Sequence, residues 1–250
     1  YVFDALKYSS NRKDILMIKD QIKFYNLDIL NFKKLKKIIN IINPDTVFHL
    51  AAESHVDRSI DSPSEFIQTN IIGTYNLLEI SREYYSLLDT NDQANFRFHH
   101  VSTDEVFGSL DVSGDKFRED TSYDPKSPYS ASKASADHLT KAWGKTYRMP
   151  IIISHSSNNY GPFQLPEKLI PLTISKVMRN KDIPLYGNGN QIRDWIHVDD
   201  HVKAISELLK SYSPGENYNI GGENERTNLN VVEMICDIFD ELEDERFYNK

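Results

Sequence analysis

The sequence predicts an α/β protein: a Rossmann-like, doubly wound parallel sheet whose first βα unit is missing, followed by a smaller mixed α/β lobe. Short β-branched runs alternate with segments of helical periodicity, which is typical of βαβ units. Polar residues follow the predicted strand 96–101 at its C-terminal end, where open α/β sheets bind ligands. After residue 158, short elements rich in turn residues replace the alternation.

The alternation starts at the first residues. Residues 1–4 and 22–27 are short apolar runs and predict two strands. Between 31 and 43 the apolar residues from Leu35 to Ile42 repeat at helical spacing, with lysines on the other face, so this segment predicts an amphipathic helix.

The middle of the chain continues the same rhythm. We next expect a buried strand at 46–51 and a long helix at 63–88, which starts at 62 or 63. A further strand at 96–101 and a polar loop at 102–124 follow. Ser127-Pro128 predicts the start of another helix, because proline suits a first helical turn. A β-branched strand at 151–154 follows.

The smaller lobe has weaker signals. We expect helices at 167–178, 199–209 and 229–242, a short strand at 218–220 and a loop at 187–190. We therefore divide the chain into one lobe of residues 1–157, to which 197–212 returns, and a second lobe of residues 158–196 and 213–250.

Composition excludes several function classes. A formal net charge of -8 and a pI near 5.5 argue against nucleic-acid binding, which needs clustered basic surface. Cys236 is the only cysteine, so no internal disulfide can form, and a reducing cytoplasm is the simplest location. Within an apolar run, Cys236 is expected to be buried and inert. No apolar run approaches the ~18 residues of a membrane span.

The first residues carry a further expectation. The chain begins without methionine at Tyr1, has no signal peptide, and contains no glycine before Gly73. We therefore expect a fragment that enters a domain at the end of a strand.

Tyr129 and Lys133 are the first candidate catalytic pair. Residues four apart share one face of a helix, so the ammonium can lie near the phenol. Free tyrosine titrates near pH ~10, and a neighbouring cation lowers that pKa. Such a pair can remove a proton from a sugar hydroxyl while hydride leaves the same carbon. Tyr-x-x-x-Lys alone is common on solvated helices, so the neighbouring residues must show whether the pair is catalytic.

Asp104 and Glu105 supply that context. They follow the predicted strand at its ligand-binding end, whereas an isolated Asp-Glu pair is usually solvated. Oxidation of an alcohol needs neither an additional acid nor an additional base. Two carboxylates beside a Tyr-Lys pair therefore favour elimination of water.

With these residues identified, the chain resembles the nucleotide-sugar 4,6-dehydratases of the extended short-chain dehydrogenase/reductase family over essentially its whole length. The most specific segments are His49 to Ser59, Ser102 to Gly108, Ser127 to Asp137, Ser157 to Pro162, Pro166 to Pro171 and Gln191 to Trp195. The resemblance implies tightly bound NAD. It also implies that the family's first strand, glycine-rich turn and helix would precede Tyr1, and that its last substrate-binding segment would follow Lys250.

Cofactor positions carry over residue by residue. The residues that match them are Asp4, Ala5, Leu6, Lys7, Asp28, Ile29, Leu50, Ala51, Ala52, Ser54, Thr69, Tyr129, Lys133 and Asn159. Asp4 resembles the acidic residue that holds the adenosine ribose, since a carboxylate accepts bonds from ribose hydroxyls and repels a 2′-phosphate. Ala5, Lys7, Ser9 and Ser10 depart from the usual family pattern.

The resemblance implies a three-stage reaction on dTDP-glucose. Tyr129 takes the C4 hydroxyl proton as hydride passes to NAD, Glu105 removes the C5 proton, and Asp104 protonates the departing C6 hydroxyl. Hydride then returns to C6. Thr103 is expected to hydrogen-bond the C4 oxygen, which completes the catalytic set of Thr103, Asp104, Glu105, Tyr129 and Lys133.

The substrate positions lie mostly in the second lobe, which the resemblance makes the substrate-binding lobe. The matching residues are Ser54, Thr103, Asn158, Lys168, Leu169, Pro184, Leu185, Tyr186, Arg193 and Asn228. Arg193 and Lys168 suit the nucleotide phosphates. His55, His155 and His197 are interpreted as structural, and no cluster has metal-ligand spacing, so no metal site is expected.

Alternatives remain open at this stage. Dehydratases of UDP-glucose or GDP-mannose use the same carboxylates, a 4-epimerase shares the fold and the Tyr-Lys pair, and a truncated chain could be an inactive interaction module. The family also implies a homodimer, paired through the helices at 63–88 and 128–147.

Overall fold

The computed structural model describes residues 1–109, 116–185 and 187–248, with side chains described up to residue 242. The chain divides into two compact units, residues 1–156 with 205–220, and residues 157–204 with 221–250. The sequence placed the corresponding divisions after 157, 196 and 212. The two units are described in turn, and their assignment to cofactor and substrate stays a prediction.

The first unit is built on parallel strands. β1 (Val2–Asp4) pairs in parallel with β2 (Phe24–Asn26). A second, four-stranded parallel sheet has the order β3-β4-β5-β8. Its strands are Thr46–His49, Arg97–Thr103, Ile151–Ser156 and Asn217–Ile220. The predicted Rossmann-like α/β class is confirmed.

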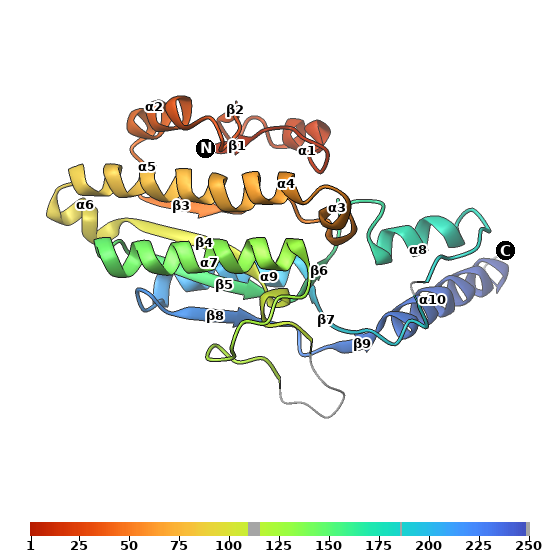
Figure 1. Cartoon of the computed structure of the whole chain (residues 1–250). Helices are drawn as coiled ribbons and strands as arrows, with labels where there is room; N and C mark the ends of the chain where they lie inside the picture. The colour runs from red at the N-terminus through yellow and green to blue at the C-terminus, as the bar shows by residue number, and fades with distance from the viewer. Residues whose placement is uncertain (110–115, 186, 249–250) are drawn as a thin grey trace. The chain divides into compact units, whose positions relative to one another are not determined.

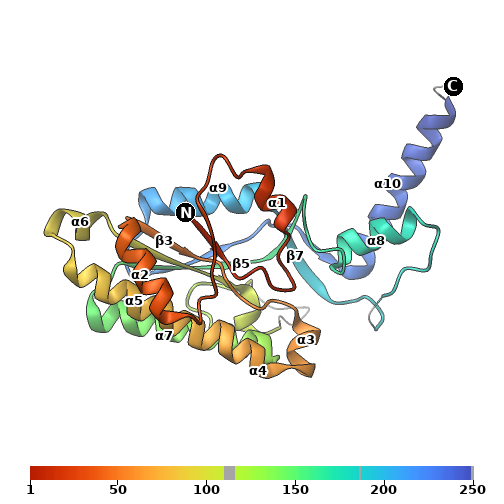
Figure 2. The same ribbon diagram turned by 90° about the horizontal axis from the view of Figure 1, so that it is seen from above.

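Long helices cover this sheet. α5 (Thr74–Leu87) and α7 (Pro128–Tyr147) pack side by side along one face, as Figure 1 shows. The part of α9 (Val198–Ser211) that belongs to this unit lies over the other face (Figure 2). α2 (Phe32–Ile42) packs on α5. Helices on both faces fit the doubly wound arrangement that the sequence predicts.

The predicted helix 63–88 is continuous but not uniformly α-helical. It consists of α4 (Pro63–Phe66), a π-helical segment η1 (Ile67–Gly73) and α5. A π-helical insertion widens the helix locally and is frequent at functional sites. Apolar periodicity cannot reveal it, because the apolar face continues through the insertion.

Several short elements escaped sequence analysis because they are short and mostly polar. They are α1 (Arg12–Met17), α3 (Val56–Asp61), α6 (Thr90–Asn95), the 3₁₀ helix η2 (Asp104–Phe107), β6 (Asn158–Tyr160), β7 (Ile192–His197) and β9 (Glu225–Thr227). Segments of three to six residues show too few repeats for a period to be measured.

The core of the first unit lies between the sheet and α5. Phe98, Ile151 and Ile153 are at most 1% exposed and pack with Leu78 and Phe96. All six residues of β5 are buried, as expected for a strand covered on both faces. Apolar side chains therefore fill the space between the sheet and α5, whereas polar groups lie towards the ends of β4 and β5.

The second unit is smaller and mixed. β6 pairs in parallel with β7, and β7 pairs antiparallel with β9. α8 (Leu169–Val177) packs on α10 (Asn228–Tyr248). The expected mixed α/β lobe is confirmed.

One expectation about the second unit is wrong. Cys236 is half-buried rather than buried. The apolar run around it lies on α10, and neighbouring positions such as Met234 and Ile238 are about half exposed, at 49% and 51%. Among the residues that the structure describes, no helix combines the length and apolarity needed to cross a membrane.

Candidate active site

α7 positions the tyrosine and the lysine. Ser127 caps the helix: its hydroxyl accepts from the Ser130 amide at 3.0 Å, the Ser130 hydroxyl accepts from the Ser127 amide at 2.9 Å, and Pro128 occupies the first turn. Tyr129 and Lys133 follow one turn apart, and both are buried, at 9% and 5% exposure. A rigidly capped helix therefore places both groups inside the unit.

The carboxylates come from the turn after β4. Asp104 and Glu105 begin η2, and Thr103 caps it, since its hydroxyl accepts from the Glu105 amide at 3.3 Å. The same hydroxyl donates to Asp104 Oδ1 at 3.4 Å. Gly108 ends the turn with φ +92°, and a Cβ there would lie 2.6 Å from the Asp124 carbonyl. Glycine thus lets the loop at Asp124 close against the turn.

The structure brings this turn and α7 together. The Thr103 side chain hydrogen-bonds Tyr129, and the negative charges of Glu105 and Asp104 act on the same phenol. The ring of Phe66 meets the Tyr129 ring edge-on, with centroids 6.3 Å apart. The expected catalytic residues are therefore neighbours.

The expected lowering of the tyrosine pKa is wrong for this environment. The pKa of Tyr129 is raised, first because the phenol is buried and then because Glu105 and Asp104 disfavour its negative form. The bond from Thr103 acts in the opposite direction. Sequence spacing predicted the cation beside the tyrosine, but it could not weigh that cation against burial and two carboxylates.

Lys133 is held on the backbone of the sheet. Its Nζ donates to the Val101 carbonyl at 2.8 Å. Burial lowers the pKa of Lys133 to about 8, although Asp137 acts to raise it. The lysine is therefore a buried cation whose charge depends on its surroundings near neutral pH.

Asn70 is a site residue that sequence analysis missed. It lies in η1 at 1% exposure, and its amide accepts from the Glu53 N–H and donates to the Glu53 carbonyl, both at 2.9 Å. It also donates to the Ser132 hydroxyl at 2.9 Å, and Ser132 donates to the Tyr129 carbonyl at 2.7 Å. Asn70 thus ties the loop after β3 to the first turns of α7. A polar residue within the apolar helix 63–88 was the available signal.

The cofactor positions near the N-terminus form a second cluster in the first unit. Asp4 ends β1, and its Oδ1 accepts from the Leu6 amide and the Ser10 hydroxyl, both at 2.6 Å. Leu6 has φ +52°, which turns the chain sharply after the strand. Lys7 and Asp28 form an ion pair at 2.9 Å. Asp4 and Asp28 therefore stand at the C-terminal ends of adjacent strands, where such sheets bind nucleotides.

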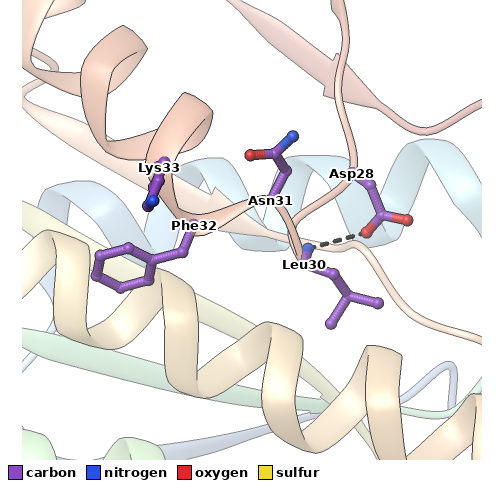
Figure 3. A pocket seen from close by; sticks show the side chains of 5 residues that line it. All are labelled: Asp28, Leu30, Asn31, Phe32 and Lys33. Atoms are coloured by element: carbon purple, nitrogen blue, oxygen red, sulfur yellow. Dashed lines mark hydrogen bonds between the residues drawn. The ribbon is translucent and has the colours of Figure 1, made fainter.

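Two hollows adjoin this cluster. An open depression of about 530 Å³ is lined by Asp28, Leu30, Asn31, Phe32 and Lys33, and in Figure 3 the Leu30 amide donates to Asp28. A groove of about 420 Å³ is lined by Lys7, Tyr8, Leu30, Glu53, Arg58, Ser64, Glu65, Gln68 and Thr69. Leu30 lines both hollows. Neither is lined by a predicted catalytic residue, and each is lined by predicted cofactor positions, Asp28 in the first and Lys7 and Thr69 in the second.

The charges of this region suit an elongated polar ligand. The pKa of Asp28 is lowered: burial opposes the shift, but the Leu30 amide and the Lys7 ammonium outweigh it. Lys7 and Arg58 both line the groove. Carboxylates at strand ends and cations along a groove are the groups that hydroxyls and phosphates require.

The remaining cofactor positions of the first unit differ in exposure. Leu50 is 61% exposed and Thr69 is 8% exposed. Ala51 and Ser54 are exposed, whereas Ala5 and Ala52 are half-buried. Ile29 is buried against Gly73, where a Cβ would come within 2.4 Å of its side chain. Ile29 is therefore a packing residue, and Leu50, Ala51 and Ser54 form an open loop after β3.

The predicted substrate positions of the second unit lie on β6, α8, β7 and the start of α10. Asn158 and Asn159 are on β6, and the Asn159 amide oxygen meets His201 Nδ1 at 2.7 Å. Lys168 caps α8, which begins at Leu169. Arg193 is exposed on β7 and donates to the Ile192 carbonyl at 2.8 Å.

The other substrate positions gather around Gly189. The Leu229 amide donates to the Gly189 carbonyl at 3.0 Å, and a Cβ on Gly189 would lie 2.6 Å from Leu185. Asn228 begins α10, and Pro184 is exposed. Tyr186 lies outside the described residues. The structure thus brings Leu185 and Asn228 into one region, and the roles of all these residues stay predictions.

The histidines expected to be structural have such contacts. His55 caps α3, accepting from the Arg58 amide at 3.4 Å, and His197 meets the Tyr160 ring edge-on. His155 is buried at 1% exposure and lies 3.1 Å from Asp137. Within residues 1–109, 116–185 and 187–248, no group of three or more His, Cys, Asp or Glu residues is arranged to hold a metal ion.

Comparison with known proteins gives a consistent result. Residues 3–249 match the family model described as GDP-mannose 4,6 dehydratase. A dTDP-glucose 4,6-dehydratase of Escherichia coli is 51% identical over 249 residues, covering 96% of this chain and 69% of the relative.

Solved structures show the same likeness. A dTDP-glucose 4,6-dehydratase from Bacillus anthracis in complex with NAD is 43% identical, with a TM-score of 0.84 over 95% of this chain and 71% of that one. A dTDP-glucose 4,6-dehydratase from Streptomyces venezuelae, bound to NAD and dTDP, is 38% identical, with a TM-score of 0.87 over 94% of this chain and 70% of that one.

The Asn70 contacts generate a stability prediction. Asn70→Ala leaves the Glu53 N–H and carbonyl without their amide partner, and each unsatisfied buried polar group costs about 1–3 kcal/mol. We expect the variant to lose about 2–4 kcal/mol of unfolding free energy in urea. Ser132→Ala removes only hydroxyl bonds and should lose about 0.5–1.5 kcal/mol. Equal losses in the two variants would show that the two Glu53 bonds of Asn70 add no stability beyond its bond to Ser132.

Proposed function

The chain belongs to the nucleotide-sugar 4,6-dehydratases of the extended short-chain dehydrogenase/reductase family, and we propose that it dehydrates dTDP-glucose to dTDP-4-keto-6-deoxyglucose with NAD as the recycled oxidant. One observation carries the proposal: Asp104 and Glu105 act on the same buried Tyr129 phenol that Thr103 hydrogen-bonds. An acid and a base beside an alcohol-oxidising tyrosine are what loss of water requires.

NAD fits the first unit. The Asp4 carboxylate at the end of β1, the Lys7–Asp28 pair and the groove that contains Lys7 and Thr69 supply groups for a dinucleotide. The sugar-oxidising chemistry comes from the nicotinamide, which when bound accepts hydride from C4 and later returns it to C6. Asp4, Ala5, Leu6, Lys7, Asp28 and Ile29 would hold the adenosine side, and Leu50, Ala51, Ala52, Ser54, Thr69 and Asn159 the remainder.

Proton removal at C4 falls to Tyr129. Its phenol needs help to ionise because burial and two carboxylates raise its pKa. Lys133 supplies a positive charge one helical turn away, and a hydrogen bond with Thr103, made when its single hydroxyl proton turns from Asp104 to the phenol oxygen, lowers the pKa of Tyr129. Thr103 also stands where it can hydrogen-bond the C4 oxygen as the ketone forms.

Elimination falls to the two carboxylates. The 4-ketone acidifies the C5 proton, which Glu105 removes as the base. Asp104 gives its proton to the C6 hydroxyl, which leaves as water. Thr103 bonds both residues, through the Glu105 amide and through Asp104 Oδ1, so the cap of η2 fixes the acid and the base relative to each other.

Nucleotide binding is assigned to the second unit. Arg193 and Lys168 offer charge to the phosphates, and Asn158, Leu169, Pro184, Leu185, Tyr186 and Asn228 complete the set of substrate positions together with Ser54 and Thr103. The relatives that act on dTDP-glucose favour this nucleotide over UDP-glucose or GDP-mannose. We also propose a cytoplasmic location, in keeping with the single cysteine.

A 4-epimerase is the principal rival. It would use Tyr129, Lys133 and NAD but would give no role to Asp104 and Glu105. The capped turn that holds both carboxylates beside Tyr129 therefore favours the dehydratase.

The protein is further proposed to form a homodimer. Exposed apolar side chains continue along η1, α5 and α7, including Ile67, Ile72, Tyr75 and Tyr147 at 40–48% exposure. Such a face suits an isologous contact between two copies. Ile72→Asp should raise the dimer dissociation constant about tenfold or more in sedimentation equilibrium. Ile41→Asp, on α2 at 67% exposure, should leave it unchanged. A monomer of the unmodified protein at all concentrations would contradict the proposal.

The proton-removal step generates a kinetic prediction. Tyr129→Phe should lower turnover of dTDP-glucose by about 10²–10⁴, the usual contribution of a positioned acid-base group, with little change in substrate affinity. Tyr147→Phe, at 43% exposure on the same helix, is the matched control and should behave as the unmodified protein. Undiminished turnover in the Tyr129 variant would exclude the assigned base.

The elimination step separates dehydratase from epimerase. Asp104→Asn keeps the size of the side chain but cannot donate the proton that water needs. We expect formation of the 6-deoxy product to fall by about 10²–10⁴. Glu105 should still exchange the C5 hydrogen, so substrate recovered from D2O should carry deuterium at C5. Asp124→Asn, at an exposed carboxylate paired with Lys126, serves as the control. Unchanged dehydration in the Asp104 variant would give the acid role to another group.

A further inference from the structure

Asp137 is a buried carboxylate that the proposed reaction does not use. It lies on α7, one turn after Lys133, and has no exposed surface. Buried carboxylates occur almost only with partners, because removal from water is costly. Its partners are His100 Nε2 at 3.0 Å, His155 Nε2 at 3.1 Å, the Ser102 hydroxyl at 2.9 Å and the Tyr123 hydroxyl at 3.0 Å. Four side chains from three segments therefore converge on one carboxylate.

These contacts stabilise the ionised form of Asp137. Burial raises its pKa, but the close imidazoles of His100 and His155 outweigh burial and hold the pKa well below its usual range. Burial, and then the charge of Lys133, lower the pKa of His100 to about 4, so that imidazole is neutral near pH 7. Burial and Asp137 raise the pKa of Tyr123, which stays a phenol. The negative charge of Asp137 is thus not cancelled by His100, Ser102 or Tyr123.

Lys133 is the buried cation on the same helix. It is 5% exposed, and its Nζ is anchored on the Val101 carbonyl. A buried ammonium without a negative neighbour loses its proton readily, and Asp137 is the group that opposes this loss. Charges one helical turn apart interact strongly where little water screens them.

We propose that Asp137 is a positioning residue for Lys133: its buried carboxylate on the next turn of α7 supplies the charge that keeps the lysine an ammonium while its Nζ bonds the Val101 carbonyl. The catalytic importance of that ammonium rests on the proposed function, whereas the charge interaction between Lys133 and Asp137 (the Lys133–Asp137 pairing) does not. His100, His155, Ser102 and Tyr123 hold the carboxylate in place.

Other charged or titratable groups face the pair from each packed element. They are His49 on β3, His100 on β4, His155 on β5, Asp104 and Glu105 on η2, Tyr123 in the preceding loop, and Tyr129 and Lys141 on α7. From η1 the neutral amide of Asn70 donates to the Ser132 hydroxyl, next to Lys133 in the chain. Arg58 of α3 pairs with Glu65 of α4, and Glu79 of α5 bonds Trp143 at the far end of α7. Lys141 is partly buried, and the charge of Asp137 also acts to raise its pKa, so the titration of Lys141 is measured separately.

Removal of the Asp137 charge should change the pKa of Lys133 in one direction only. In Asp137→Asn the pKa of Lys133 should fall below its value of about 8, because burial is then less opposed. A pKa lowered by about one unit makes the ammonium tenfold scarcer at any pH above both values. Asp137 also raises the pKa of Tyr129, so its removal would by itself favour the phenolate. This effect is the smallest of the influences on the Tyr129 pKa. The activity of the variant relative to the unmodified protein should therefore decline about fivefold between about pH 6 and pH 8, and approach a tenfold decline about two pH units higher.

The experiment is a carbon-13 and nitrogen-15 titration of lysine side chains in the NAD-bound protein, with the Lys133 signal assigned by its loss in Lys133→Met. The unmodified protein should titrate near the value of about 8, and Asp137→Asn at least about one unit lower. Tyr123→Phe is the matched control: it removes one hydrogen bond from the same carboxylate but keeps its charge, so Lys133 should titrate as in the unmodified protein. Lys141 should shift in both variants, because it interacts with Asp137 and donates to the Tyr123 hydroxyl. The signal of Lys203, an exposed lysine on α9, separates a local effect from a general one.

Each outcome decides the proposal. An unchanged Lys133 titration in Asp137→Asn overturns it, and so does an equal shift in Tyr123→Phe. A relative activity that is low but independent of pH would make Asp137 a purely structural residue. Where Asp137→Asn does not fold, the unmodified protein still decides, because a neutral Lys133 amine at pH 7 contradicts the pairing. If the titration agrees but no dehydrated sugar forms, the proposed function fails while the pairing stands.

Discussion

The site depends on one constraint: the two central strands of the four-stranded parallel sheet, β4 and β5, are buried on both faces, so groups that meet a ligand lie where these strands end. In β5 every residue is buried, and in β4 the residues Phe98, His99, His100 and Ser102 are buried. Register then fixes what meets at these strand ends. Ser102 pairs with His155 and Thr103 with Ser156, so the strand ends carry hydroxyl and imidazole groups side by side. α7 carries Tyr129, Lys133 and Asp137 at intervals of one turn. The catalytic groups therefore lie where the end of β4 meets α7.

Much of this arrangement could be predicted from the sequence because it rests on long periodic segments. The helix at 128–147 has its start fixed by Ser127-Pro128, the strand at 96–101 is rich in apolar residues, and the strand at 151–154 is mostly β-branched. The proximity of Asp104 and Glu105 to Tyr129 followed from the rule that ligands bind at strand ends. By contrast, short polar elements such as β6 and β7 gave no period, and the π-helical segment within 63–88 left the apolar face intact.

The electrostatic balance of the site could not be predicted, for a physical reason. Spacing shows which charges can be neighbours, but a pKa also depends on how completely each group is removed from water. Lys133 lies one turn from Tyr129, as its position requires, and yet the tyrosine pKa is raised because burial and the carboxylates act together. Burial likewise turns Lys133 from an ordinary lysine into a group that titrates near pH 8.

Burial also explains why polar residues recur at interior positions of β4 and β5, where apolar side chains would be expected. His99, His100, Ser102, Ser154 and His155 are at most 4% exposed, although they lie within a sheet core. A strand made only of valine and isoleucine would pack as well but would offer no partner to a carboxylate brought in by α7. His99 meets Ser154 across the strands at 2.8 Å, and Ser102, His100 and His155 converge on Asp137. The buried polar residues of β4 and β5, among which Ser102 and His155 are register partners, therefore mark the place where α7 inserts a charge, and that helix also carries the catalytic pair.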